Sequence, residues 1–281
     1  MVLRAFDVIA FDADDTLWHN ERSYRDGRER FRRILARAGV DLDDTEIEAR
    51  VTRTEVANIE YFGYGVSSFA LSLIETAIHA SDGRIAARDL HALIELARQM
   101  LTEDIELFDG VAESLAALSS SYPLMLVTKG DLLHQTSKLE RSGLKQYFSY
   151  VEVVSHKTPA VYAGILARHG VAPGRFLMVG NSLRSDVLPV IDVGGWAVHV
   201  PAALSWSHEH ADVPEHARPR YFELPAIGGL PGLIADVSAA AVAASAGKND
   251  STASSDSVMS TGVPKMVVVL KNDSTPPGVE S

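Results

Sequence analysis

Short apolar runs that each end in a polar residue are the feature of this sequence that most restricts its fold. Four such runs occur, separated by helix-like patterns, at Val8–Phe11 before Asp12, Leu124–Val127 before Thr128, Val151–Val154 before Ser155 and Phe176–Val179 before Gly180. Continuous apolar runs of this length predict buried strands of a parallel sheet. Strands that alternate with helices predict a doubly wound α/β fold, in which ligands bind beyond the carboxyl ends of the strands. We therefore expect the polar residues after the strands to converge on one site.

The connection that follows the first strand is too long for a simple crossover. Roughly 85 residues of mostly helical pattern lie before Leu124, whereas a crossover needs a single helix. Amphipathic patterns predict helices over Ser23–Ala38, Ser67–Ala80 and Arg88–Leu101. The sequence therefore predicts a Rossmann-like core over 1–19 and 106–237, with an all-helical cap over 20–105 inserted into it. Residues 238–281, rich in Ala, Ser, Gly, Thr and Pro, are expected to form a disordered tail.

Composition excludes several classes of protein. With 26 Lys and Arg against 37 Asp and Glu, the net charge of −11 repels nucleic acid and anionic membrane surfaces. The absence of cysteine excludes disulfide frameworks, thiol catalysis and Cys-ligated metals. Asp7 interrupts the place where a signal peptide would need an apolar run, and no run approaches the roughly 18 apolar residues of a membrane span. We expect a cytoplasmic enzyme that binds neither nucleic acid nor membrane.

Two carboxylates directly follow the first strand. Asp12 and Asp14 stand at positions i and i+2, so both can face one cavity while Ala13 turns away. One carboxylate can then attack an electrophile while its neighbour transfers protons. A solvated acidic turn is the alternative interpretation, and the residues after the later strands argue against it.

The later strand ends provide the other groups that phosphoryl transfer requires. Such a reaction needs an in-line nucleophile, a cation that spreads charge over the equatorial oxygens, and Mg²⁺ held by oxygen ligands. Taken alone, Lys157 is typical of a surface lysine and Thr128 of a strand-end cap. Their occurrence after successive strands, followed by Gly180-Asn181-Ser182-Leu183-Arg184-Ser185-Asp186, favours a shared site.

In these residues the sequence resembles the haloacid dehalogenase-like (HAD) hydrolase superfamily, specifically its phosphatase branch with a helical cap after the first strand. The resemblance covers about residues 5–235. It implies that Asp12 is the nucleophile that forms an aspartyl-phosphate, and that Asp14 protonates the leaving oxygen and then activates water. It also implies that Thr128 hydrogen-bonds the phosphoryl oxygens and that Lys157 neutralises them. The implied Mg²⁺ ligands are Asp12, Asp14 through its carbonyl, Asp186 and Asn181, with waters completing the octahedron.

Two positions depart from the family's pattern. Asp15 stands where Gly is common, which adds negative charge to the mouth of the site in a turn that Asp tolerates. Asn181 stands where Asp is common. An amide oxygen can ligate a hard cation, but the loss of one charge predicts weaker Mg²⁺ binding.

The same residues bear on several other activities. Dehalogenases lack the carboxylate that Asp14 provides, and phosphonatases use a cap lysine, whereas the first lysine here is Lys129, beyond the cap. A phosphomutase stays open because it keeps both aspartates. A receiver domain also accepts phosphate on Asp, but it has no room for the long insertion. Asn181 leaves open a catalytically weakened protein used for binding.

The substrate is expected to be a small phosphate ester, and the residues for its non-phosphate part are less defined. Tyr61, Phe62 and Tyr64 surround glycines in the cap and could close over a substrate, although packing between cap helices explains them equally well. Lys129 is expected at the rim of the site beside Thr128. The sequence indicates neither the particular ester nor the oligomeric state.

Overall fold

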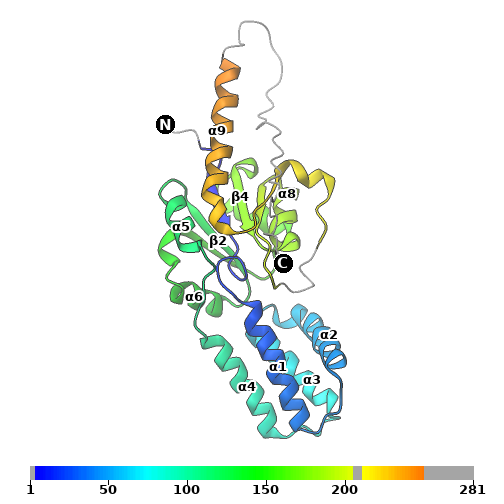
Figure 1. The fold of residues 1–281 in the computed structure, drawn as a ribbon. Helices are drawn as coiled ribbons and strands as arrows, with labels where there is room; N and C mark the ends of the chain where they lie inside the picture. The colour runs from blue at the N-terminus through cyan, green and yellow to red at the C-terminus, as the bar shows by residue number, and fades with distance from the viewer. Residues whose placement is uncertain (1–3, 205–210, 250–281) are drawn as a thin grey trace, which may run out of the picture.

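The computed structural model describes residues 4–204 and 211–249 and contains one parallel six-stranded sheet (Figure 1). The strand order is β3-β2-β1-β4-β5-β6, and neighbouring strands pair in parallel throughout. The predicted doubly wound α/β fold is therefore confirmed. The strands are β1 (Val8–Phe11), β2 (Leu124–Lys129), β3 (Phe148–Val154), β4 (Phe176–Gly180), β5 (Trp196–His199) and β6 (Tyr221–Glu223).

Alternation of side chains along the strands decides which helices cover which face. Ile9 and Phe11 point to the face covered by α5 (Val111–Ser119), α6 (Leu132–Arg141) and α9 (Leu230–Asn249). Val8 and Ala10 point to the other face, covered by α7 (Pro159–His169) and α8 (Leu188–Asp192). Because successive strand residues face opposite sides, both faces are apolar and the sheet is the middle of three layers.

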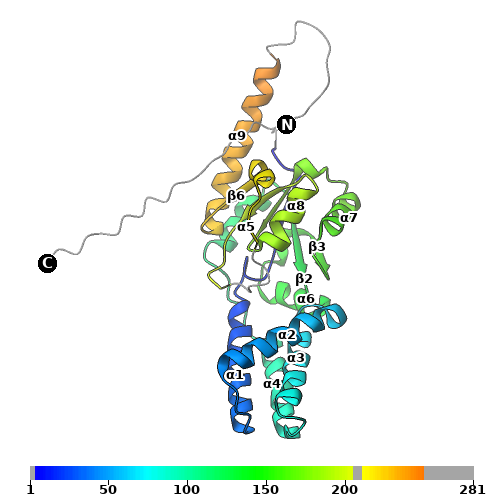
Figure 2. The same ribbon diagram turned by 90° about the vertical axis from the view of Figure 1, so that its right-hand side faces the viewer.

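Four helices form the cap at the end of the molecule opposite α9 (Figures 1 and 2). Each contributes an apolar stripe to a separate hydrophobic core that includes Phe31, Leu73 and Leu93. The sequence predicted three of these helices to within two residues at each end but did not single out α2, where Ile47 and Val51 are the buried apolar residues among many charged ones. The four are α1 (Glu21–Arg37), α2 (Asp44–Phe62), α3 (Val66–Ala80) and α4 (Ala87–Thr102).

Two chain segments join the cap to the sheet domain, and they are hydrogen-bonded to each other. Trp18 forms an antiparallel bridge with Leu107, and the His19 amide donates to the Glu106 carbonyl at 2.9 Å. The cap is thus attached directly beyond the carboxyl end of β1, beside Asp12.

Two expectations differ from the structure. β3 was expected to be buried, but it is the edge strand, and Val151 is 43% exposed because no strand pairs beyond it. The disordered tail was expected from residue 238, but α9 continues to Asn249. Leu230, Ile234 and Val237 anchor that helix on the sheet, and the alanine-rich segment after them has high intrinsic helix propensity. Residues 250–281 lie outside the described residues.

Across the ranges that the structure describes, none of the helices combines the length and the apolarity that a membrane span requires.

Candidate active site

A buried lysine between two carboxylates forms the centre of the site. Asp12 follows β1, and its amide donates to the Val179 carbonyl of β4 at 2.9 Å, which fixes the strand end. Lys157 lies in the loop between β3 and α7, and its Nζ donates to Asp12 Oδ1 and, at 2.6 Å, to Asp186 Oδ1. The Lys157 side chain is 1% exposed, so both ion pairs are shielded from water, and contacts within the protein must compensate for the lost hydration.

Burial and neighbouring charges act in opposite directions on the pKa values of Asp12 and Lys157. Burial raises the pKa of Asp12 to about 7; Lys157 opposes that rise and Asp186 adds to it. Burial acts to lower the pKa of Lys157, but attraction by Asp12 and Asp186 outweighs it, so the pKa lies above its usual value. Lys157 is therefore a fixed cation beside Asp12, and it partly offsets the rise in the pKa of Asp12.

Asp186 reaches this position because β4 ends in glycine. A Cβ atom at Gly180 would lie 2.3 Å from Asp186 Oδ2, so any side chain there would displace the carboxylate. The Ser182 amide donates to the same oxygen at 3.0 Å. Both Asp186 oxygens are thus engaged, one by Lys157 and one by the backbone.

Thr16 brings two hard oxygen atoms together on the other side of Asp12. The Thr16 Oγ1 atom donates to Asp12 Oδ2 at 3.0 Å and lies 3.2 Å from Asn181 Oδ1. The backbone N–H of Asn181 donates to Thr16 Oγ1 at 3.0 Å. Carboxylate and amide oxygens are the ligands that Mg²⁺ prefers, so this side of the site fits such a cation in its chemistry. Within residues 4–204 and 211–249, no group of three or more His, Asp or Glu side chains has a metal-binding arrangement.

Asp14 is held by three donors. Trp18 Nε1 donates to Asp14 Oδ1 at 2.6 Å, Lys138 Nζ to the same oxygen at 2.5 Å, and Gln135 Nε2 to Oδ2 at 2.8 Å. Burial acts to raise the pKa of Asp14, but Lys138 and the hydrogen bonds outweigh it and hold the pKa below its usual value. The resting state of Asp14 is therefore the carboxylate.

Asp15 has a structural role that the sequence only partly indicated. Its φ of 59° lies in the left-handed region, consistent with the expected unusual turn. Its carboxylate accepts the amides of Asn20 and Glu21, each at 3.0 Å, and so binds the first turn of α1. Burial raises the pKa of Asp15 to about 6, against those two hydrogen bonds. The turn that carries Asp12 and Asp14 is thus tied directly to the cap.

One cavity connects these groups to the cap helices. From the sheet side it is lined by the strand-end residues, including Thr128, which is 1% exposed. From the cap side it is lined by α1, α2 and α3. The predicted site residues among the lining are Asp12, Asp14, Tyr64, Thr128, Lys129, Lys157, Asn181 and Asp186.

Comparison with known families agrees with this geometry. The family model described as haloacid dehalogenase-like hydrolase matches residues 6–194, from just before β1 into the loop after α8. The chain belongs to this family of hydrolases.

Solved and curated HAD relatives cover nearly the same length. A HAD-like family hydrolase from Xanthomonas campestris is 39% identical, with a TM-score of 0.73 over 88% of this chain and 95% of that one. Human N-acylneuraminate-9-phosphatase is 23% identical over 84% of this chain and 97% of its own. The Bacillus subtilis HAD-hydrolase YfnB, solved bound to magnesium, is 17% identical with a TM-score of 0.58 over 83% of this chain and all of its own, which shows the shared HAD fold.

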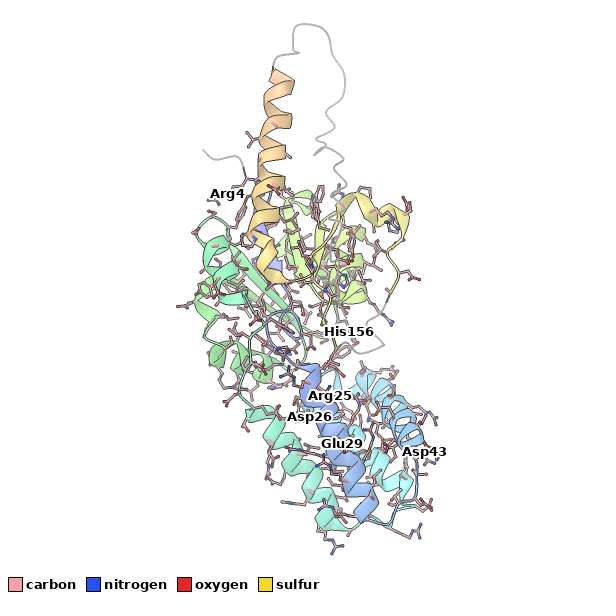
Figure 3. The ribbon with its side chains drawn as sticks, in the orientation of Figure 1. Arg4, Arg25, Asp26, Glu29, Asp43 and His156 are labelled. Atoms are coloured by element: carbon pink, nitrogen blue, oxygen red, sulfur yellow. The ribbon has the colours of Figure 1, made fainter. Side chains whose placement is uncertain are left out.

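The four predicted substrate residues divide into two pairs. Tyr64 and Lys129 line the cavity; Lys129 Nζ lies 4.4 Å from the Tyr64 ring centroid and donates to Ser185 Oγ at 3.1 Å. Tyr64 also packs edge-on against His156, labelled in Figure 3 where the cap meets the sheet domain. Tyr61 and Phe62 are instead the last residues of α2, 76% and 56% exposed, and do not line the cavity. The predicted loop begins only after them, at Gly63.

Several lining residues carried no motif and were missed. Gln135 and Lys138 stand three residues apart on α6, a polar pair on the buried side of a helix that begins directly after the Thr128 loop. That placement is a signal that the sequence did contain. The cap residues Glu21, Arg28 and Glu55 offered no such signal, because cap helices contain many similar charges.

Proposed function

We propose that this HAD hydrolase is a Mg²⁺-dependent phosphatase that cleaves a small phosphate monoester through an aspartyl-phosphate on Asp12. The observation that carries the proposal is the buried Lys157 between Asp12 and Asp186, open to a cavity that Thr128 also lines. A fixed cation beside a carboxylate nucleophile suits a reaction that concentrates negative charge on phosphoryl oxygens.

The proposed reaction has two steps. In the first, Asp14 takes up a proton from solvent and gives it to the ester oxygen as that oxygen leaves, while an Asp12 oxygen bonds to phosphorus. In the second, Asp14 takes a proton from water, the water oxygen attacks phosphorus, and Asp12 is released with inorganic phosphate. Lys138 favours the anionic form of Asp14, which the second step requires.

The proposed Mg²⁺ would be held by oxygens of Asp12 and Asn181, by the Asp14 carbonyl and by Asp186, with waters. When bound, it neutralises charge on the phosphoryl group. The hard oxygens around Thr16 support this assignment, as does the magnesium in the YfnB structure. Asp12 and Asn181 bring their oxygens together beside Thr16, whereas the Asp186 oxygens accept from Lys157 and the Ser182 backbone amide.

The relatives favour a phosphate ester over a halogenated acid. N-acylneuraminate-9-phosphatases from human, mouse and rat match at 22–23% identity. Together with the carboxylate at Asp14, this similarity supports phosphomonoester hydrolysis. The substrate panel therefore includes an N-acylneuraminate phosphate, an ester that carries a carboxylate besides its phosphate.

The test is phosphate release from a panel of small phosphate esters with Mg²⁺ or with EDTA. Asp12→Asn should reduce turnover by about 10³-fold or more because the nucleophile is removed. Asp26→Asn, an exposed change on α1, is the matched control and should keep full turnover. Unchanged release by Asp12→Asn would exclude the covalent mechanism, and unchanged release in EDTA would exclude the metal.

A further inference from the structure

A second buried charge cluster lies in the cap half of the cavity, away from the groups that act on phosphate. Arg25, Asp26 and Glu29 are exposed on α1 (Figure 3), whereas Arg28 on the same helix is only 8% exposed and lines the cavity. Its position is therefore set by partners in the interior of the cap.

Carboxylates already surround the Arg28 guanidinium. Its Nη2 donates to Glu55 at 2.6 Å, its Nη1 to Glu21 at 3.4 Å, and its Nε lies 3.3 Å from a Glu48 oxygen. The Phe69 ring lies against the same group, 5.4 Å from its centroid. The Arg28 guanidinium is thus paired with carboxylates of the protein itself and is not available to form a bidentate pair with an anionic ligand.

The two halves of the cavity therefore differ in charge. The sheet half is balanced, because three lysines accompany three aspartates: Lys129, Lys138 and Lys157 with Asp12, Asp14 and Asp186. In the cap half, the charged residues that the structure places along the cavity are Glu21, Arg28 and Glu55; Asp15, in the turn after Asp14, also lines the cavity and accepts the Glu21 backbone amide. The Glu21 and Glu55 oxygens that Arg28 contacts keep further lone pairs, which accept hydrogen bonds, so this half favours ligand groups that donate.

We infer that the cap half selects phosphate esters whose remote end donates hydrogen bonds and carries no second negative charge, such as phosphates of sugars and amino sugars. The inference rests on the proposed phosphatase activity, with the phosphate in the sheet half. A carboxylate or second phosphate at the remote end would face Glu21 and Glu55 with Arg28 already paired, and unpaired like charges at close range discriminate strongly.

Three esters of nearly equal size test this inference: glucose 6-phosphate, glucosamine 6-phosphate and 6-phosphogluconate. We expect kcat/KM for the first two to exceed that for 6-phosphogluconate by roughly tenfold or more. Glu55→Gln removes one negative charge from the cavity, so the ratio of kcat/KM for glucose 6-phosphate to kcat/KM for 6-phosphogluconate should fall by about threefold or more. Glu60→Gln removes the same charge from an exposed position of α2 and should leave the ratio unchanged.

Binding separates this inference from the proposed function. The Kd values of the three esters for the Asp12→Asn protein, measured by calorimetry, should follow the same order without any turnover. Equal or tighter binding of 6-phosphogluconate, or an unchanged ratio in Glu55→Gln, overturns the inference even if the enzyme is a phosphatase. The expected binding order without phosphate release from any ester, including p-nitrophenyl phosphate, would instead overturn the proposed function.

Discussion

The sheet end and the cap end of the cavity each bury a cation among carboxylates, but they assemble it differently. Lys157 meets Asp12 and Asp186 because three loops leave the same edge of a parallel sheet. Arg28 meets Glu21 on its own helix and Glu55 on α2 because two helices pack side by side. The first arrangement is fixed by backbone hydrogen bonds between strands, and the second by side-chain packing alone. The two ion-pair clusters therefore differ in how they are assembled, and we propose different tasks for them: chemistry in the sheet half and selection in the cap half.

Replacing the sheet-end cation should have the largest effect. Lys157→Met leaves Asp12 and Asp186 facing each other without a cation, so we expect phosphate release to fall by about 10²–10³-fold. The free energy of unfolding should fall by about 3 kcal/mol, because two buried carboxylates lose their partner. Steady-state phosphate release and urea denaturation measure the two effects. Lys145→Met, which breaks an exposed pair with Glu140, should cost about 0–1 kcal/mol and no activity.

Replacing the cap-end cation should separate stability from chemistry. Arg28→Met leaves Glu21 and Glu55 without a cation, whereas Glu48 keeps its pair with Arg32, and we expect a similar loss of about 3 kcal/mol in the free energy of unfolding. Because Arg28 does not contact the groups that we propose to act on phosphate, turnover of p-nitrophenyl phosphate should stay within about tenfold. Arg33→Met, an exposed change on the same helix, is the control. A loss of turnover as large as that of Lys157→Met would abolish the distinction between the two halves.

The cap cluster should also make the free energy of unfolding depend on pH. Burial raises the pKa of Glu21 from 4.5 to about 7. Between these values the folded chain holds a proton that the unfolded chain releases, so the stability contributed by protonated Glu21 is lost as pH rises through about 7. Relative to Glu21→Gln, the wild type should lose up to about 3 kcal/mol between pH 4.5 and pH 8.

Urea denaturation of both proteins at several pH values measures this difference. For Glu60→Gln, an exposed change on α2, the free energy of unfolding should change with pH as it does in the wild type. Parallel curves for Glu21→Gln as well would mean that Glu21 is not a buried carboxylate of the kind that its contacts indicate.

The sequence alone determined the sheet, the presence of a helical cap and the meeting point of the strand-end residues. Parallel strands place their carboxyl ends at one edge, so Asp12, Thr128, Lys157 and Asp186 could be brought together from the strand pattern without knowing the strand order. The long helical insertion after β1 followed from length and periodicity, since no crossover needs so many residues. These inferences succeed because they depend on local pattern and backbone geometry.

Only the tertiary structure decided the partners of those residues. Lys138 and Gln135 reach Asp14 because of how α6 lies on the sheet, and Arg28 is buried among glutamates because of how α1 packs against α2. Tyr64 lines the cavity while Tyr61, three residues earlier, is exposed at the end of α2. Each outcome depends on the rotation of one helix relative to an element distant in sequence, and periodicity does not encode that rotation when many charged residues share the helix surface.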